Sequence, residues 1–511
     1  MKKVIKYSTT LAGASLFLMI ISMASRGVGF FREIIFANEF GLSEEFDIYL
    51  IASVIPVTTN TIIYFIGQNF FIPNYSDNSE SNKFKSLLFL RNTFYSFGFG
   101  GIIIGVVYFL FADNIIGLFV NSNMPVNTDA VAIFELFALT IPIASCISII
   151  SAYSNRVKRF LPPALSSLGL NISVILFVIL INYKIGVMSI AIGYLIGSIG
   201  QLIYLFYSSS IKDIIFTNGK VSDWSPKDLV SSSLFIIIII ESVGQFYGIA
   251  DRFFFNSVSE GSISALNYAQ TLVSIPISII AVPLATTFFS KISNDLNDAS
   301  FSEFNVSIKN SISITLIIFI PIFFIFQFWG FEIISLLLQR GKFDTVASNK
   351  TALALKYLNL GLLFYAIYSI FNKVLYSAKL IKQLLYITLV GILIKIIFNF
   401  YLVEYFDFVG LALSTSMSYF FFFSASLIVI VRKYRFKWVI ESMLELSVFF
   451  INAIISILLS EVLITNLMSD RLIAIMLKTL VFLFIFTINL ILIQDSGFKF
   501  ITDRMFIKKI I

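Results

Sequence analysis

The chain has no histidine and a single cysteine, Cys146, in 511 residues. Histidine is the usual general acid or base near neutral pH, and zinc sites are built mainly from histidine and cysteine. One cysteine cannot form a disulfide within the chain. These absences exclude most enzyme mechanisms, and we expect no metal and no other cofactor.

Charge is also scarce, because only 13% of the residues are charged, against roughly 25% in soluble domains. Hydrophobic residues make up 58% of the chain, and the mean hydropathy is +0.93. Apolar runs of about 20 residues recur, each long enough to cross a hydrocarbon layer of about 30 Å. A membrane β-barrel would show short alternating segments instead. The composition therefore predicts an all-α integral membrane protein.

Apolar runs bounded by charged and turn residues predict about 14 membrane-spanning helices. Their ranges are 10–37, 47–72, 87–112, 130–153, 163–182, 187–208, 230–257, 264–290, 310–330, 350–377, 383–403, 408–431, 442–465 and 472–494.

The distribution of lysine and arginine predicts the orientation of these spans. If the N-terminus is cytoplasmic, 24 of the 36 basic residues lie in inner loops or tails and only five in outer loops. Inner loops are normally the basic ones. We therefore expect both termini in the cytoplasm. The net charge of +7 follows from this orientation and from contact with anionic lipids, so it requires no nucleic-acid partner.

A weak internal repeat suggests how the helices are grouped. Arg32 and Pro56 are 24 positions apart, and so are Arg252 and Pro276. Two six-helix lobes in the same orientation, followed by two extra helices, fit this pattern, and such repeats place a substrate site between the halves. The predicted divisions are 1–215, 216–436 and 437–511.

The first span carries three charges that are expensive to place in a bilayer, Arg26, Arg32 and Glu33. Arg26 and Glu33 are seven positions apart and share a helix face, so one interpretation is a local ion pair. Two arginines exceed what one glutamate neutralises. Guanidinium groups bind phosphate in a bidentate manner, which favours a pyrophosphate-bearing ligand.

Two further spans contain acidic residues whose role the pattern leaves open. Asp251 and Arg252 are adjacent in the seventh span and point about 100° apart, so Asp251 needs another cation. Lys395, four residues before Asn399, is one candidate. Asp251 has either a structural or a transport role, and Asp47 is either a helix cap or a functional group.

Four stretches resemble the MurJ (MviN) family of lipid II flippases, and the resemblance covers roughly residues 10–430. They are SRGVGFFREIIFANEFGLSEEFD from Ser25 to Asp47, NRVKRFLPPALSSLGLN from Asn155, GSISALNYAQTLVSIPISIIAVPLATTFFSKIS from Gly261 and LQRGKFD from Leu338. The resemblance implies a fourteen-helix member of the MOP exporter superfamily. Its two six-helix lobes would surround a cationic cavity that opens alternately to each side.

The resemblance also implies which residues bind substrate. Ser25, Arg26, Arg32 and Asp47 match positions associated with the cavity, and Glu33 and Arg252 complete our expected binding set. The chain departs from the family where charged residues are usual, and there it has Asn60, Thr61, Tyr64, Gln270 and Thr271. A head group less acidic than that of lipid II, such as an O-antigen or capsule repeat, is therefore a second candidate substrate.

Some relatives have a sodium site whose ligands would fall on Asp251, Asn399 and Thr415, but Lys395 occupies a further ligand position. We expect the Lys395 ammonium to replace the ion and pair with Asp251, so that transport needs no sodium.

Together these observations predict a monomeric flippase of the bacterial cytoplasmic membrane. Its partners would be a polyprenyl-pyrophosphate-linked saccharide and the membrane lipids. A MATE-like drug or ion antiporter is an alternative, but two arginines attract cationic drugs poorly. A membrane glycosyl polymerase or ligase is a second alternative, disfavoured by the short outer loops at 113–129 and 331–349.

Overall fold

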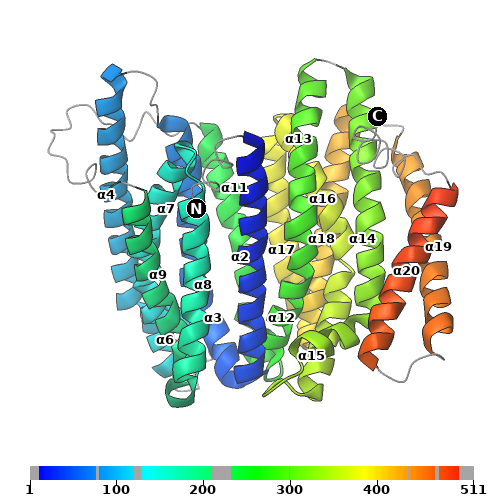
Figure 1. Ribbon diagram of the computed structural model, residues 1–511, viewed down its shortest axis with the longest axis horizontal. Helices are drawn as coiled ribbons and strands as arrows, with labels where there is room; N and C mark the ends of the chain where they lie inside the picture. The colour runs from blue at the N-terminus through cyan, green and yellow to red at the C-terminus, as the bar shows by residue number, and fades with distance from the viewer. Residues whose placement is uncertain are drawn as a thin grey trace. The chain divides into compact units, whose positions relative to one another are not determined.

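The computed structural model describes residues 11–75, 80–119, 128–209, 211, 232–298, 300–434, 438–465 and 471–493. All regular elements in these ranges are helices (Figure 1). The chain forms two compact units. Unit 1 comprises Met1–Ser264 with Arg340–Phe343, and unit 2 comprises Ala265–Gln339 with Asp344–Ile511. The predicted all-α class is confirmed, whereas the predicted divisions at 215 and 436 stay predictions.

Unit 1 is a bundle in which most helices are long enough to cross a bilayer. Its helices are α2 (Leu11–Phe40), α3 (Glu44–Asn74), α4 (Glu80–Leu110), α5 (Ala112–Ile116), α6 (Thr128–Ala138), α7 (Thr140–Arg156), α8 (Leu161–Ile185), α9 (Met188–Ser208), α11 (Ser232–Ile249) and the 3-10 turn η2 (Arg252–Ser257). The first residues of α12 also belong to it.

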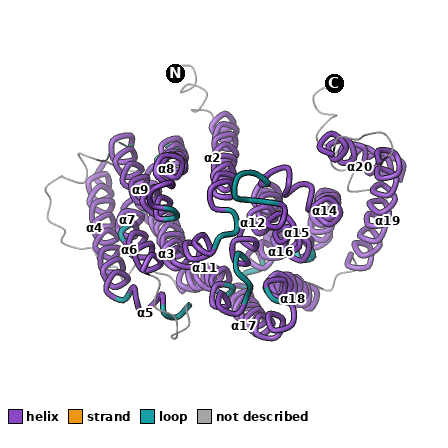
Figure 2. The backbone as a smooth tube through the Cα atoms, turned by 90° about the horizontal axis from the view of Figure 1, so that it is seen from below, coloured by secondary structure: helices purple, strands orange, loops and turns teal. Residues whose placement is uncertain are grey.

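Packing in unit 1 follows from small residues at the helix contacts. Helix α8 packs on α9 and on α2, and α7 packs on α3 and α4; Figure 2 shows these helices nearly end-on. A Cβ atom at Gly193 of α9 would lie 2.9 Å from the Cα atom of Val174 in α8. Only glycine permits this approach, which is how helices in membranes gain van der Waals contact.

Unit 2 contains the remaining helices. They are α12 (Ser262–Pro276), the π-helical turn η3 (Ile277–Ala281), α13 (Val282–Asn297), α14 (Phe301–Leu338), α15 (Thr345–Asn359), α16 (Leu362–Ser377), α17 (Ile381–Phe406), α18 (Phe408–Tyr434), α19 (Trp438–Thr465) and α20 (Arg471–Ile493). Helix α17 packs on α18, α14 on α15 and α19 on α20. Gly410 of α18 touches the backbone of α17, and a Cβ atom there would lie 2.4 Å from the carbonyl carbon of Leu402.

The number of spans is smaller than predicted within the described part of the chain. Eleven helices there are long and apolar enough to cross a membrane, or twelve if α15 and α16, bent by 45°, form one span. The first and seventh predicted spans overlap α2 and α11, which are not among the eleven. The prediction of fourteen spans is therefore not confirmed.

Several predicted spans are interrupted. The span predicted at 130–153 consists of α6 and α7, separated at Leu139. The span predicted at 264–290 passes through η3 directly after Pro276, where proline lacks the amide proton that an α-helix needs. The span predicted at 230–257 was too long, because α11 ends at Ile249 and a 3-10 turn follows.

Three glycines in the left-handed region join distant segments of unit 1. Gly41 and Gly341 have φ values of +61° and +53°, and the Lys342 amide donates to the Asn38 carbonyl at 2.9 Å. A Cβ atom at Gly341 would lie 2.4 Å from that carbonyl oxygen. Gly261, with φ of +72°, contacts the Leu42 carbonyl in the same way. We call Gly41, Gly261 and Gly341 the glycine joint.

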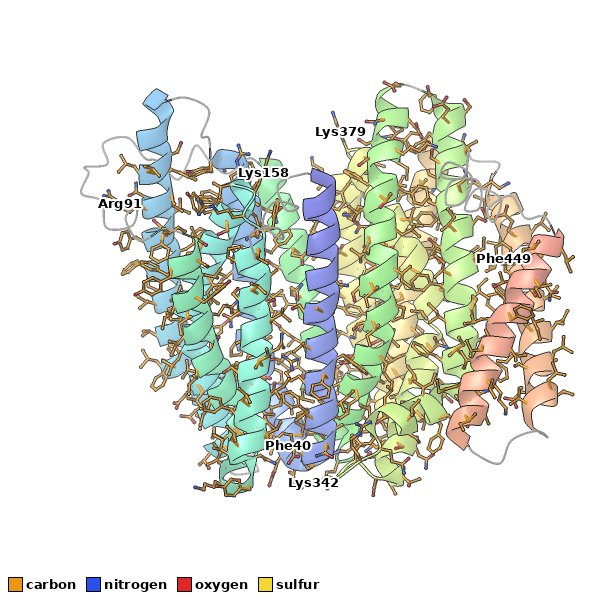
Figure 3. The ribbon with its side chains drawn as sticks, in the orientation of Figure 1. Phe40, Arg91, Lys158, Lys342, Lys379 and Phe449 are labelled. Atoms are coloured by element: carbon orange, nitrogen blue, oxygen red, sulfur yellow. The ribbon has the colours of Figure 1, made fainter. Side chains whose placement is uncertain are left out.

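The ends of unit 1 carry the basic residues that the topology prediction separates. Phe40 and Lys342 lie at one end, whereas Arg91 and Lys158 lie toward the other (Figure 3). The prediction assigned Lys342 to an outer loop, and Arg91 and Lys158 to inner loops. The opposite placement agrees with that assignment, while the cytoplasmic location of the termini stays a prediction.

Candidate functional site

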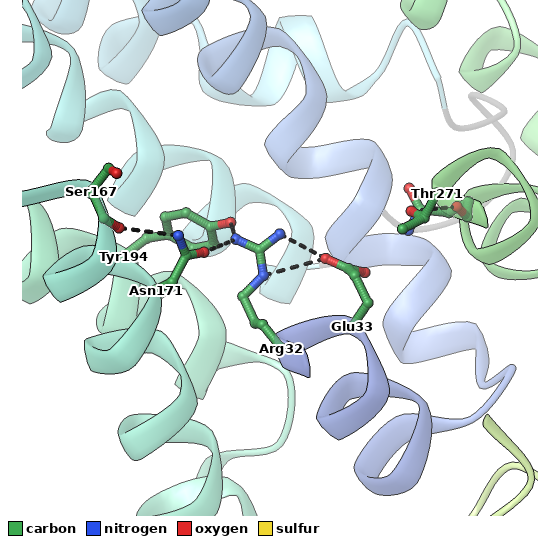
Figure 4. Close-up of polar contacts among 7 residues, drawn as sticks. Arg32, Glu33, Ser167, Asn171, Tyr194 and Thr271 are labelled. Carbon is green, nitrogen blue, oxygen red and sulfur yellow. Dashed lines mark hydrogen bonds and ion pairs between the residues drawn. The ribbon is translucent and has the colours of Figure 1, made fainter. Parts of the chain in front are cut away.

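The Arg32 guanidinium is the centre of a hydrogen-bonded cluster in unit 1 (Figure 4). Its Nη2 and Nε atoms donate to Glu33 Oε1 at 2.6 and 3.3 Å. Its Nη1 donates to Asn171 Oδ1 at 3.0 Å and to the Tyr194 hydroxyl. The guanidinium also lies over the Phe36 and Tyr194 rings, 5.4 and 5.5 Å from their centroids. Most of its donors are therefore used within the unit.

The ion pair on α2 differs from the local pair considered from the sequence. Glu33 forms an ion pair with its neighbour Arg32, at 2.6 Å, rather than with Arg26, which lies about two helical turns away. Adjacent helical residues point about 100° apart, but the long arginine side chain curls along the helix surface and reaches the carboxylate. The side chains of Arg32 and Glu33 are only 19% and 10% exposed, so each charge largely neutralises the other.

Arg26 lies halfway along α2 and differs from Arg32 in its exposure and in its hydrogen bonds. Its side chain is exposed, and among the described residues no hydrogen bond or ion pair to it is found. The neighbouring Ser25 hydroxyl is 3.0 Å from the hydroxyl of Ser167 in α8. A Cβ atom at Gly27 or Gly29 would meet nothing within 4 Å. Among the described residues, the surface of α2 beside Arg26 is therefore open.

A pocket of about 310 Å³ lies among α3, α6, α7, α8 and α9 in unit 1. Its polar lining residues are Asn60, Thr61, Tyr64, Thr140, Tyr194, Ser198 and Gln201, and its apolar ones include Phe137 and Leu170. None of its lining residues is Asp, Glu, Lys or Arg. Tyr194 belongs both to this pocket and to the Arg32 cluster, so the two lie side by side.

Asp47 caps a helix other than its own. Ser43 is the N-cap of α3, and its side chain accepts from the Phe46 amide. The Asp47 carboxylate instead accepts from the Gly261 amide at 2.8 Å, the Ser264 amide at 2.6 Å and the Ser264 hydroxyl. A carboxylate at a helix N-terminus satisfies unpaired amides and opposes the helix dipole. We call this arrangement at the start of α12 the Asp47 cap.

Arg252 adds a cation near the Asp47 cap. It is 8% exposed, donates to the Ile263 carbonyl at 3.4 Å and interacts electrostatically with Asp251 and Asp47. The sequence placed Asp251 and Arg252 inside the seventh span, but they follow α11 and begin η2. Arg252 is therefore held in the same buried cluster as Asp47 and does not lie on a helix face.

The four residues predicted as an ion-coupling or structural set fall in different units. Lys395, Asn399 and Thr415 belong to unit 2 and are 1%, 0% and 2% exposed, whereas Asp251 belongs to unit 1. The Ser414 hydroxyl donates to Asn399 Oδ1, and the Thr415 hydroxyl donates to the Leu411 carbonyl at 3.0 Å. The pairing of Lys395 with Asp251 stays a prediction.

The partners of the predicted charges, namely Asn171, Tyr194 and Ser264, were not predicted from the sequence. Asn171 ends one of the family-like stretches and Ser264 lies near the start of another, so the resemblance could have pointed to both. Tyr194 sits in an apolar run, and nothing in the sequence marks it as a partner. Among the described residues, no group of three or more histidine, cysteine, aspartate or glutamate side chains could hold a metal ion.

Comparison with known proteins assigns this arrangement to a family. The model of the family described as "Lipid II flippase MurJ" matches residues 36–492. A probable lipid II flippase MurJ of Borreliella burgdorferi is 26% identical over 420 residues, covering 80% of each chain. The lipid II flippase MurJ of Thermosipho africanus is 29% identical over 426 residues, covering 79% of this chain and 82% of that protein.

Solved structures agree with the sequence comparison. A lipid II flippase MurJ in an inward closed conformation aligns with a TM-score of 0.78 and 25% identity, covering 94% of this chain and all of that one. An inward-facing multidrug resistance MATE transporter of the MOP superfamily aligns with a TM-score of 0.62 at 12% identity, which indicates a shared fold. The chain is therefore an integral membrane transporter, not an enzyme, and it belongs to the lipid II flippase MurJ family.

Proposed function

We propose that this chain moves a polyprenyl-pyrophosphate-linked saccharide from the cytoplasmic to the outer leaflet of the bacterial inner membrane by alternating access. The saccharide is lipid II or an O-antigen or capsule-type repeat unit. Membership of the family, and relatives that are named lipid II flippases, support this class of substrate. We further propose that the chain acts as a monomer with both termini in the cytoplasm.

The observation that carries the proposal is the exposed guanidinium of Arg26 halfway along α2. The sequence predicts that α2 spans the membrane, and an arginine at the centre of a spanning helix costs about 3 kcal/mol even on lenient scales, so such residues mark pathways or binding sites. Its planar N–H groups match the oxygens of a diphosphate. The ligand that best compensates an open arginine at this depth is therefore anionic, as a pyrophosphate is.

Arg32 has a supporting role in this proposal. Its bonds to Glu33, Asn171 and Tyr194 leave few donors for a ligand. The cluster instead ties α2, the helix that carries Arg26, to α8 and α9. Of the two arginines, Arg26 is therefore the primary phosphate ligand, and Arg32 anchors its helix.

An exposed cation at position 26 disfavours the MATE-like alternative, because it would repel the cationic drugs that such antiporters carry. The likeness to MATE transporters, at 12% identity, concerns the fold. Alternating access lets the charged head group cross inside the protein while the lipid tail stays in the bilayer.

The test is a flipping assay with purified variants in proteoliposomes that contain a polyprenyl-pyrophosphate saccharide, scored by how much head group becomes accessible on the opposite side. Arg26→Ala should reduce the flipping rate roughly ten- to a hundredfold, as expected for the loss of a charge-assisted contact. Arg26→Lys should restore part of it, because lysine keeps the charge but loses the bidentate geometry.

The matched control is Arg432→Ala, which removes an exposed arginine from the last turn of α18. It should flip at the wild-type rate. Wild-type flipping by Arg26→Ala would exclude the proposed role of this residue, and absence of flipping by the wild-type protein would exclude the function.

A further inference from the structure

The pocket beside the Arg32 cluster is polar, but none of its lining residues is charged. Among its lining residues, Asn60, Gln201, Thr61, Thr140 and Ser198 offer amide and hydroxyl groups. Phe137, Tyr194 and Tyr64 add aromatic rings, and the Phe137 and Tyr194 ring centroids are 5.2 Å apart. Ligand sites are commonly apolar surfaces with a few precisely placed polar groups. This lining suits a ligand with both hydroxyl groups and apolar C–H faces.

One of these groups lacks a hydrogen-bond partner within the part of the chain that the structure describes. The Asn60 Nδ2 donates to the Thr140 hydroxyl at 2.8 Å, but the Asn60 Oδ1 is buried with no hydrogen-bond partner among the described residues. A buried, unpaired acceptor costs about 1–3 kcal/mol. A hydroxyl or amide N–H from a ligand would remove this cost.

Other groups face the pocket on an accessible side. Thr61 and Tyr64 are exposed on α3, three positions apart and therefore on one helix face. The Gln201 amide donates to the Ser166 hydroxyl at 3.2 Å through Nε2, and its carbonyl oxygen has no hydrogen bond among those found in the described chain. The pocket thus combines amide oxygens that can accept hydrogen bonds with aromatic rings on which a ligand can pack.

The absence of charge in the lining determines what the pocket would reject. A carboxylate placed there would lose its hydration without meeting a lysine or arginine, and this loss is costly in a medium of low dielectric constant. A neutral sugar has no such penalty. A site built to hydrogen-bond a ligand also discriminates strongly against ligands that lack the matching groups.

We propose that this pocket binds an uncharged sugar residue of the head group, a pyranose bearing hydroxyl and acetamido groups, and so selects the saccharide attached to the carrier. The inference rests on the proposed function, in which Arg26 holds the pyrophosphate. Tyr194, shared by the pocket and the Arg32 cluster, joins the sugar-binding region to α2, the helix that carries Arg26.

The test measures dissociation constants of the full-length protein in nanodiscs for three probes. They are undecaprenyl pyrophosphate alone, the same carrier bearing N-acetylglucosamine, and the same carrier bearing glucuronic acid. The wild-type protein should bind the N-acetylglucosamine carrier at least roughly tenfold more tightly than the bare carrier, and the glucuronic acid carrier no more tightly than the bare one.

Variants separate recognition from folding. Gln201→Leu should reduce the gain from N-acetylglucosamine by roughly three- to tenfold without changing binding of the bare carrier. Asn60→Leu should have the same effect, and provides a second test if one variant folds poorly. Ser166→Ala is the control, because it breaks the internal bond to Gln201 but leaves the amide in the pocket. It should keep the full gain.

A gain-of-function variant tests the charge argument directly. Thr61→Arg introduces a cation at an exposed position of the pocket and should raise affinity for the glucuronic acid carrier above that for the N-acetylglucosamine carrier.

Failure of the sugar-binding inference can be distinguished from failure of the proposed pyrophosphate site. If the wild-type protein binds the bare and N-acetylglucosamine carriers equally, or if Gln201→Leu and Asn60→Leu keep the full gain, the pocket does not recognise the sugar and the proposed flippase function is untouched. If the bare carrier does not bind at all, the pyrophosphate site and the inference fall together.

Discussion

Replacing Asp47 with asparagine should release the start of α12, because the side chain would lose its charge inside a buried cluster. Asp47 is 1% exposed and accepts hydrogen bonds from the Gly261 amide and from the amide and hydroxyl of Ser264. Asparagine has one acceptor oxygen in place of two, and its NH₂ group would face an N–H donor. The nearby Arg252, 8% exposed, would also lose one of its two acidic neighbours.

The size of the effect follows from these contacts. A hydrogen bond to a charged group contributes about 1.5–3 kcal/mol. Asp47 accepts three such bonds. Because asparagine keeps one acceptor oxygen but loses the charge, we expect a loss of about 3 kcal/mol in the free energy of local opening. This corresponds to a roughly hundredfold faster exchange of the protected amides.

Hydrogen exchange of a peptide that covers the Gly261 and Ser264 amides measures this opening directly. The matched control is Asp344→Asn, because Asp344 is the exposed N-cap of α15 and accepts from the Ala347 amide at 2.8 Å. Asparagine and aspartate are equally good at exposed N-caps, so the start of α15 should exchange at the wild-type rate. If Asp47→Asn leaves exchange at Gly261 and Ser264 within threefold of wild type, the reasoning about the Asp47 cap is wrong.

Two further predictions concern unit 2. Replacing sodium by choline should leave the flipping rate within twofold of its original value, because the buried Lys395 ammonium would supply the positive charge of an ion; a tenfold loss in proteoliposomes would refute this. Gly410→Ala should lower the free energy of unfolding by about 1–3 kcal/mol, because the new methyl group would overlap the Leu402 backbone. Gly100→Ala on α4, where a Cβ atom meets nothing within 4 Å, should be neutral or stabilising in the same thermal unfolding measurement.

The positions of the helices could be predicted from the sequence, because the hydropathy and the length of an apolar run are local properties. Most predicted spans coincide with helices to within a few residues. The interruptions were harder to place, although the break at Leu139 has a local cause. Pro142 lies in the first turn of α7 and cannot donate the helical hydrogen bond to the Ala138 carbonyl. The end of α11 at Ile249 also escaped prediction, since the apolar residues Phe253, Phe254 and Phe255 resume directly after the Asp251-Arg252 pair.

The contacts of the candidate site were harder to predict from the sequence than the helices. Periodicity predicted that Arg26 and Glu33 share a face of α2, but it could not show that Glu33 pairs with Arg32, whose side chain curls back to it. The bonds of Asp47 to Gly261 and Ser264 link residues more than 200 positions apart, and no local pattern encodes such contacts. The sequence therefore identified the charged residues, because a charge within an apolar run is energetically costly. Their partners could be identified only from the folded structure.

The glycine joint has a consequence for how this region can change. At each of Gly41, Gly261 and Gly341, the atom nearest to an added Cβ would be a backbone carbonyl oxygen of the neighbouring segment. Side chains can yield gradually by changing rotamer, but peptide groups cannot. The joint should therefore open or close as a whole, and a methyl group added at any one of its three positions should hold all of it apart.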